Sequence, residues 1–103
     1  MVIKVIYLEV AVQDLASIYK YISQDSAKYA KLEVQKIKAF AESLKNQPLK
    51  GKLYQTLNSV VIRSAIFKHY IIFYTFQNEE INILTIHHHA RLITNNPAFT
   101  DEE

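Results

Sequence analysis

The chain has 103 residues, the size of one domain, and half of them are apolar. A chain of this length buries a core without disulfides, and the absence of cysteine excludes a disulfide framework, a thiolate metal site and a cysteine nucleophile. Twelve Lys and Arg against ten Asp and Glu leave a net charge of +2, which permits contact with nucleic acid but does not argue for it.

The organisation of the chain predicts one domain in the cytoplasm. No apolar run approaches the roughly 18 residues that span a bilayer, and the start of the chain lacks the pattern of a signal peptide. We therefore expect no membrane contact. The domain should cover residues 1–97, and residues 98–103 should form an acidic, frayed tail.

The first half of the chain predicts a strand and then two helices. Residues 2–8 are short and largely apolar, which favours a buried strand. From residue 9 the apolar positions recur at helical spacing, and this stripe consists of Ala11, Leu15, Ile18 and Ile22. A second helix begins at once, with Asp25 or Ser26 as its N-cap, and ends before Pro48. Its stripe consists of Ala30, Val34, Ile37, Ala41 and Leu44, so Glu33 and the lysines should face solvent.

The second half of the chain predicts a loop followed by three strands. Residues 46–59 form the loop, and the apolar runs at 60–67, 69–76 and 81–91 are rich in the residue types that favour strands. The short connections between the runs require antiparallel hairpins. The fold class is therefore α+β, in the order β-α-α-β-β-β, with a helical hairpin packed on an antiparallel sheet.

Strand alternation assigns the polar residues to two faces of this sheet. Hairpin geometry pairs Phe76 with Ile81, Tyr70 with His87, and Arg63 with Ile72. One face then holds a mixed aromatic and cationic set, Arg63, Tyr70, Tyr74, His87 and His89, and we expect it to be the functional surface. The other face is more apolar and should receive the helices. It holds Ile62, Ile71, Phe73, Leu84 and Ile86, with His69 and His88 at its edge.

Two kinds of chemistry suit this mixed face. His87 and His89 could ligate a metal together, but no third ligand falls in the same segment, so we predict neither a metal nor another cofactor. Metal-free phosphoryl transfer on RNA needs an acid and a base with cations for the phosphate, and a histidine with Arg63 and Arg91 supplies two of those roles. Histidines at a strand end are equally often plain, partly buried groups. The residues predicted to bind a partner are Tyr70, Tyr74, His88, Lys50 and Lys52, although a lysine-rich loop is often only solvated surface.

Several short motifs, in this order, resemble the RelE/ParE superfamily of bacterial toxins, which includes the plasmid-stabilisation proteins. They are Ala11-x-x-Asp14-Leu15-x-x-Ile18-x-x-Tyr21-Ile22, Pro48-x-x-Gly51-Lys52, Arg63-Ser64, Tyr70-Ile71-Ile72-Phe73-Tyr74 and Ile83-x-x-Ile86-x-His88-x-Ala90-Arg91. The resemblance covers about residues 2–97. It implies a helical hairpin on a twisted antiparallel sheet, and a toxin that a cognate antitoxin wraps and neutralises.

The resemblance leaves two targets open. The ParE-like branch acts on DNA gyrase, and it is favoured by the long hairpin, by the missing acidic partner and by Tyr70, which stands where nuclease members carry a cation. The RelE-like branch cleaves messenger RNA in the ribosome, and it is favoured by Arg63, Arg91 and the C-terminal histidines. We expect gyrase inhibition, with the ribonuclease as the alternative and a non-toxic binding module as a third possibility. The sequence leaves the oligomeric state open.

Overall fold

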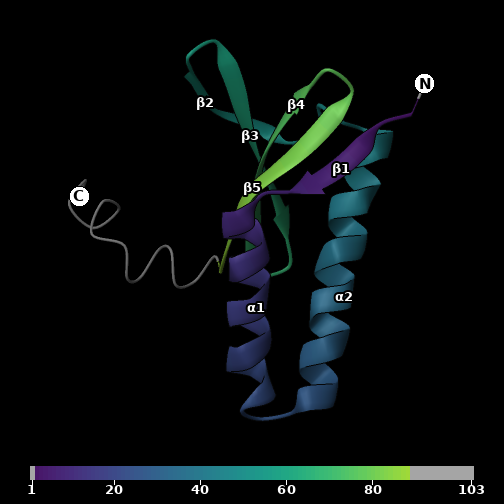
Figure 1. Ribbon diagram of the computed structural model, residues 1–103, viewed down its shortest axis with the longest axis vertical. Coiled ribbons are helices and arrows are strands. Elements are labelled where there is room, and N and C mark those ends of the chain that lie inside the picture. Colours follow the sequence, from purple (N-terminus) through teal and green to yellow (C-terminus); the bar gives the residue numbers. More distant parts are fainter. Residues whose placement is uncertain (1, 89–103) are drawn as a thin grey trace, which may run out of the picture.

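The structure is a computed structural model that describes residues 2–88. Its elements follow the order β1 (Lys4–Tyr7), α1 (Glu9–Ser23), α2 (Ala27–Ser43), a short 3-10 turn η1 (Leu44–Asn46), β2 (Lys52–Leu57), β3 (Val60–Phe67), β4 (Tyr70–Gln77) and β5 (Glu80–His88). Figure 1 shows the two helices as a hairpin beside a twisted sheet. The predictions for His89, Arg91 and the tail at 98–103 lie outside the described residues.

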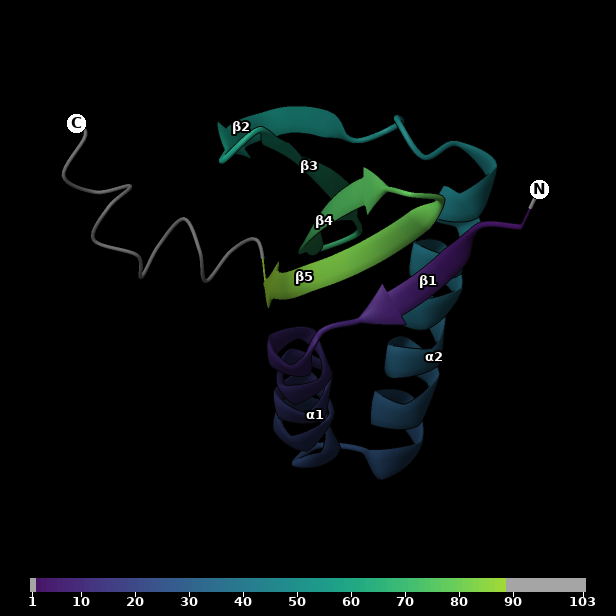
Figure 2. The ribbon, with the colours of Figure 1, turned by 45° about the horizontal axis from the view of Figure 1, so that its top comes forward.

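The sheet has five strands in the order β1-β5-β4-β3-β2. The pairs β2–β3, β3–β4 and β4–β5 are antiparallel, and β1 pairs with β5 in parallel (Figure 2). The α+β fold with a helical hairpin is confirmed. Two details of the prediction were wrong: the expected loop at residues 46–59 contains β2, and β1 is a half-exposed edge strand instead of a buried one.

Both helices form where their apolar stripes predict. Helix α1 buries Ala11, Leu15 and Ile18, and the Ser26 hydroxyl caps α2 by accepting a hydrogen bond from the Tyr29 N–H at 3.1 Å. One position of the α2 stripe was predicted wrongly. Glu33 is buried, whereas Val34 is only half-buried, because the stripe follows residues 30, 33, 37, 41 and 44.

A β-bulge changes the register that alternation predicts. Phe76 pairs with Ile81 as expected, but the register shifts between Phe73 and Tyr74. Tyr70 therefore lies opposite His88 and not His87. An extra residue in one strand turns the side chains beyond it to the other face, which sequence alternation alone does not reveal.

The face predicted to be functional is in fact the core face. Tyr70 and Tyr74 are 5% and 0% exposed and pack with Ile72 against the helices. Arg63 lies opposite Tyr74 and not Ile72, and therefore shares this face. Residues Ile71, Phe73 and His87 alternate with the core positions and lie on the other face of the sheet, which we call the open face. The helices lie together on one side of the sheet (Figure 2).

The core joins both helices to the middle of the sheet. Its members are Ala11, Leu15, Ile18, Ile37, Ala41, Leu44, Ala65, Tyr70, Ile72, Tyr74, Ile81, Ile83 and Ile86. Within residues 2–88, no helix is both long and apolar enough to cross a membrane.

Candidate functional site

Two predicted site residues, Arg63 and Tyr74, fix the loop between η1 and β2. The Tyr74 hydroxyl donates to the Pro48 carbonyl at 2.8 Å and accepts from the Gly51 N–H at 2.9 Å. The Arg63 Nη1 donates to the carbonyls of Gly51 at 3.0 Å and Leu49 at 3.4 Å. These four hydrogen bonds, which we call the loop clamp, satisfy backbone groups that no strand or helix satisfies.

Only glycine fits at position 51 of the loop clamp. A Cβ atom there would lie 2.8 Å from both Cε1 and Oη of Tyr74, and 2.9 Å from the Ser64 carbonyl oxygen. The close approach lets the Tyr74 ring reach the backbone of the loop. The loop is therefore held against the sheet by these contacts.

The clamped loop sends its two lysines to different sides of the sheet. The Lys50 Nζ lies 5.0 Å from the centre of the Phe40 ring, on the helix side. Lys52 pairs with Ser64, which lies between the core-facing residues Arg63 and Ala65, so Lys52 belongs to the open face. The structure does not bring the two lysines together.

The Phe40 ring belongs to a stack that joins α2 to β3. The rings of Phe40 and Phe67 lie 5.0 Å apart at an angle of 23°, and the Lys68 Nζ lies 5.5 Å from the Phe67 ring. The same ammonium lies 3.6 Å from Oε1 of the buried Glu33. This distance permits an ion pair but exceeds a hydrogen bond, and Oε1 has no hydrogen-bond partner among residues 2–88.

The histidines lie at the end of β5, away from Arg63. His87 meets the Phe73 ring edge-on at 5.5 Å on the open face, and His88 meets the Tyr70 ring edge-on at 5.4 Å. The His69 and His88 rings stack at 6.1 Å. Arg63 lies opposite Tyr74, four residues along β4 from the position opposite His88, which corresponds to about 13 Å along a strand. Arg63 and His87 also lie on opposite faces.

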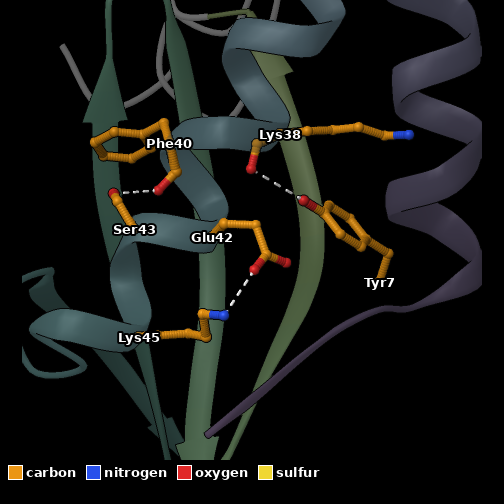
Figure 3. Close-up of polar contacts among 6 residues, drawn as sticks. All are labelled: Tyr7, Lys38, Phe40, Glu42, Ser43 and Lys45. Atoms are coloured by element: carbon orange, nitrogen blue, oxygen red, sulfur yellow. Dashed lines mark hydrogen bonds and ion pairs between the residues drawn. The ribbon is translucent and has the colours of Figure 1, made fainter.

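A groove of about 450 Å³ runs between β1 and the two helices. Its lining is mainly apolar and consists of Tyr7, Val12, Leu15, Ala16, Tyr19, Val34, Lys38 and Glu42. Burial, with a smaller contribution from the nearby Glu42 carboxylate, raises the pKa of Tyr7 to about 12. The Tyr7 hydroxyl donates to the Lys38 carbonyl at 3.5 Å, and Glu42 pairs with Lys45 at 3.1 Å (Figure 3). Tyr7 therefore enters the groove as a neutral phenol.

Comparison with known proteins decides the family. The family model for the ParE toxin of type II toxin–antitoxin systems, parDE, matches residues 5–93. The chain belongs to the ParE toxin family. The fold of the chain is similar to that of a chain in the chromosomal ParDE TA system from P. aeruginosa, with a TM-score of 0.69 and 21% identity over 84% of this chain and 95% of that chain. A search of curated proteins gave no significant match.

Membership in the ParE family makes the chain a toxin of the type II class, and a type II system pairs its toxin with an antitoxin. The structure of the ParE-family chain also shows residues of the candidate site that the sequence did not identify. Glu33, Lys68, Phe40 and Tyr7 all enter the clusters described above. Glu33 carried a signal, since a carboxylate at helical spacing from Ala30 and Ile37 falls in the buried stripe.

One acidic residue links α1 of the ParE-family chain to β5. The Asp14 Oδ2 accepts hydrogen bonds from the Thr85 hydroxyl and from the Ile86 N–H, the latter at 2.9 Å. The second bond satisfies a backbone donor close to the bulge in the β4–β5 ladder. Among residues 2–88, no three His, Asp or Glu side chains are arranged to hold a metal ion.

Proposed function

We propose that the chain inhibits growth by acting on DNA gyrase in the bacterial cytoplasm, and that a cognate antitoxin neutralises it there. Family membership supports the toxin role. We choose gyrase as the target because the residues that a ribonuclease would need to bring together lie apart in this fold. The observation that carries the proposal is the loop clamp. Arg63 donates to two backbone carbonyls of the loop it holds.

A nuclease would use the same arginine differently. Metal-free cleavage of RNA requires a cation that contacts the phosphate and an acid–base group within hydrogen-bonding reach of the same atoms. Arg63 is half-buried against the loop, and the nearest described imidazoles lie about 13 Å along the sheet or on its other face. This separation favours a structural role for Arg63.

One observation favours the alternative, a ribosome-dependent endoribonuclease. His88, His69 and Tyr70 form a contiguous ring cluster, and Lys68 beside them contacts the buried carboxylate of Glu33. Such a set contains acid, base and cation within one region. The alternative would use these residues together with Arg63, Arg91 and a C-terminal histidine.

Expression of the toxin in a bacterial host separates these targets. We expect a DNA-damage response and filamentous cells with intact messenger RNA. Codon-specific cuts in messages that disappear in Arg63→Ala would contradict the proposal. A host that grows normally would favour the non-toxic binding module.

The matched variant for Arg63→Ala is Tyr74→Phe, which weakens the loop clamp without removing a cation. If Arg63 is structural, both variants should lose toxicity in proportion to their loss of thermal stability. If Arg63 acts in catalysis, Arg63→Ala should abolish toxicity while Tyr74→Phe, at equal stability, should keep it. Thermal melts of both purified variants measure their loss of thermal stability, against which the loss of toxicity is compared.

A further inference from the structure

The cations of the chain are concentrated in one continuous part of it. Residues 27–68, which run from α2 through β3, contain nine Lys and Arg and two Asp and Glu. Residues 2–26 and 69–88 together contain two Lys and Arg and five Asp and Glu. Both acids of the basic part are already paired, Glu33 with Lys68 and Glu42 with Lys45. Residues 27–68 therefore carry an excess of positive charge.

Two of these lysines lie over the ring stack between α2 and β3, and a third lies on the same side of α2 as Phe40. Lys50 lies over the Phe40 ring, and Lys68 lies over the Phe67 ring. Lys36 precedes Phe40 by four residues on α2, which places the two side chains on the same side of that helix. We call Lys36, Lys50 and Lys68, with the two rings, the cationic seam. All three lysines are exposed.

Hydrogen bonds and regular secondary structure hold the backbone beneath the cationic seam. Lys50 stands between Leu49 and Gly51, the two residues whose carbonyls Arg63 binds, and Lys68 occupies the tight β3–β4 turn with φ of 55°. Lys36 is carried by the middle of α2. Fixed backbone positions reduce the ordering cost when the three ammonium groups contact one extended polyanion.

We propose that the cationic seam binds the phosphate backbone of duplex DNA, the substrate on which gyrase acts. This proposal rests on the proposed function, because the DNA that the toxin contacts would be the DNA bound by gyrase. The lysine ammonium is a point charge, whereas the arginine guanidinium is a planar fork of donors. A point charge suits contact with phosphate groups that does not read the base sequence.

The geometry favours a duplex over a single strand. Single strands bind through bases that stack on free aromatic rings, but Phe40 and Phe67 are half-buried and stack on each other. An acidic peptide would need an apolar pocket for its anchoring side chain. The groove described above is lined by β1, α1 and the other side of α2, so the cationic seam does not share it.

The test measures binding of the purified full chain to a fluorescent duplex of about 20 base pairs and mixed sequence, by anisotropy over a series of salt concentrations. Binding should weaken as salt increases, and each lysine in contact should contribute about 0.9 to the slope of log K against log salt. Lys36→Gln/Lys50→Gln should reduce that slope by about 1.8, while the Glu33–Lys68 pair stays intact.

The matched control is Lys4→Gln/Lys20→Gln, which removes the same charge from β1 and α1. It should leave the slope nearly unchanged. Equal losses in both variants would show that only net charge matters and would overturn the proposal. Tighter binding of a single strand of the same length would overturn it as well, as would loss of antitoxin binding without loss of duplex binding.

The two proposals can fail separately in the same preparation. Inhibition of gyrase without binding of the duplex would refute the cationic seam alone. Binding of the duplex through the cationic seam, with no effect on gyrase, would support the DNA contact and refute the proposed target.

Discussion

The loop clamp should account for a large part of the stability of the domain, and Tyr74→Phe measures it. The substitution keeps the buried ring and removes only the hydroxyl that serves the Gly51 N–H and the Pro48 carbonyl. A buried polar group left unpaired costs roughly 1–3 kcal/mol, and the Pro48 carbonyl is only partly buried. We therefore expect a loss of about 2–4 kcal/mol in the free energy of unfolding.

Chemical denaturation measures this loss, and the m-value should stay unchanged. For a domain of this size the loss corresponds to a decrease in Tm of roughly 10–25 °C. Tyr21→Phe is the control, because the Tyr21 side chain is 69% exposed. Gly51→Ala should be at least as destabilising, because its Cβ would meet the Tyr74 ring. A Tyr74→Phe value within about 0.5 kcal/mol of the control would refute the reasoning.

Three further predictions concern other parts of the fold. Asp14→Ala should lower the free energy of unfolding by roughly 1–3 kcal/mol, because the Ile86 N–H loses its acceptor, and faster amide exchange at Ile86 should accompany the loss. Burial raises the pKa of Tyr7 to about 12 from 10.0, so its contribution to stability should be complete below pH 10 and should disappear as pH rises towards 12. Denaturation of wild type and Tyr7→Phe across that range checks this, and a constant difference would contradict it. Lys68→Ala should destabilise the fold more than Glu33→Gln/Lys68→Ala, since the single change leaves a buried carboxylate without its cation; a thermal melt of each variant decides.

The sequence predicted the helices better than the sheet, and the reason is physical. The stripes of α1 and α2 repeat over four turns, so one misplaced position such as Glu33 does not change the prediction. Strand β2 was missed because all six of its residues are exposed, and an edge strand without a buried side carries no alternation.

The position of the candidate site depended on one structural irregularity. The bulge between Phe73 and Tyr74 shifts the ladder by one residue, and this shift moves Tyr70 from opposite His87 to opposite His88. No residue type marks the bulge in the sequence. The loop clamp was also hidden, because its acceptors are backbone carbonyls and its partners lie 12 to 26 residues apart.

Inhibition of purified DNA gyrase is the measurement that decides the proposed target. The wild-type chain should block supercoiling of a relaxed plasmid, and the cognate antitoxin should restore it. The same preparation should leave ribosome-bound messenger RNA uncut. Two results together would contradict the proposed target: normal supercoiling by gyrase at every toxin concentration, and cleavage of ribosome-bound messages. They would indicate instead that the histidines at the end of β5 belong to a ribonuclease active site.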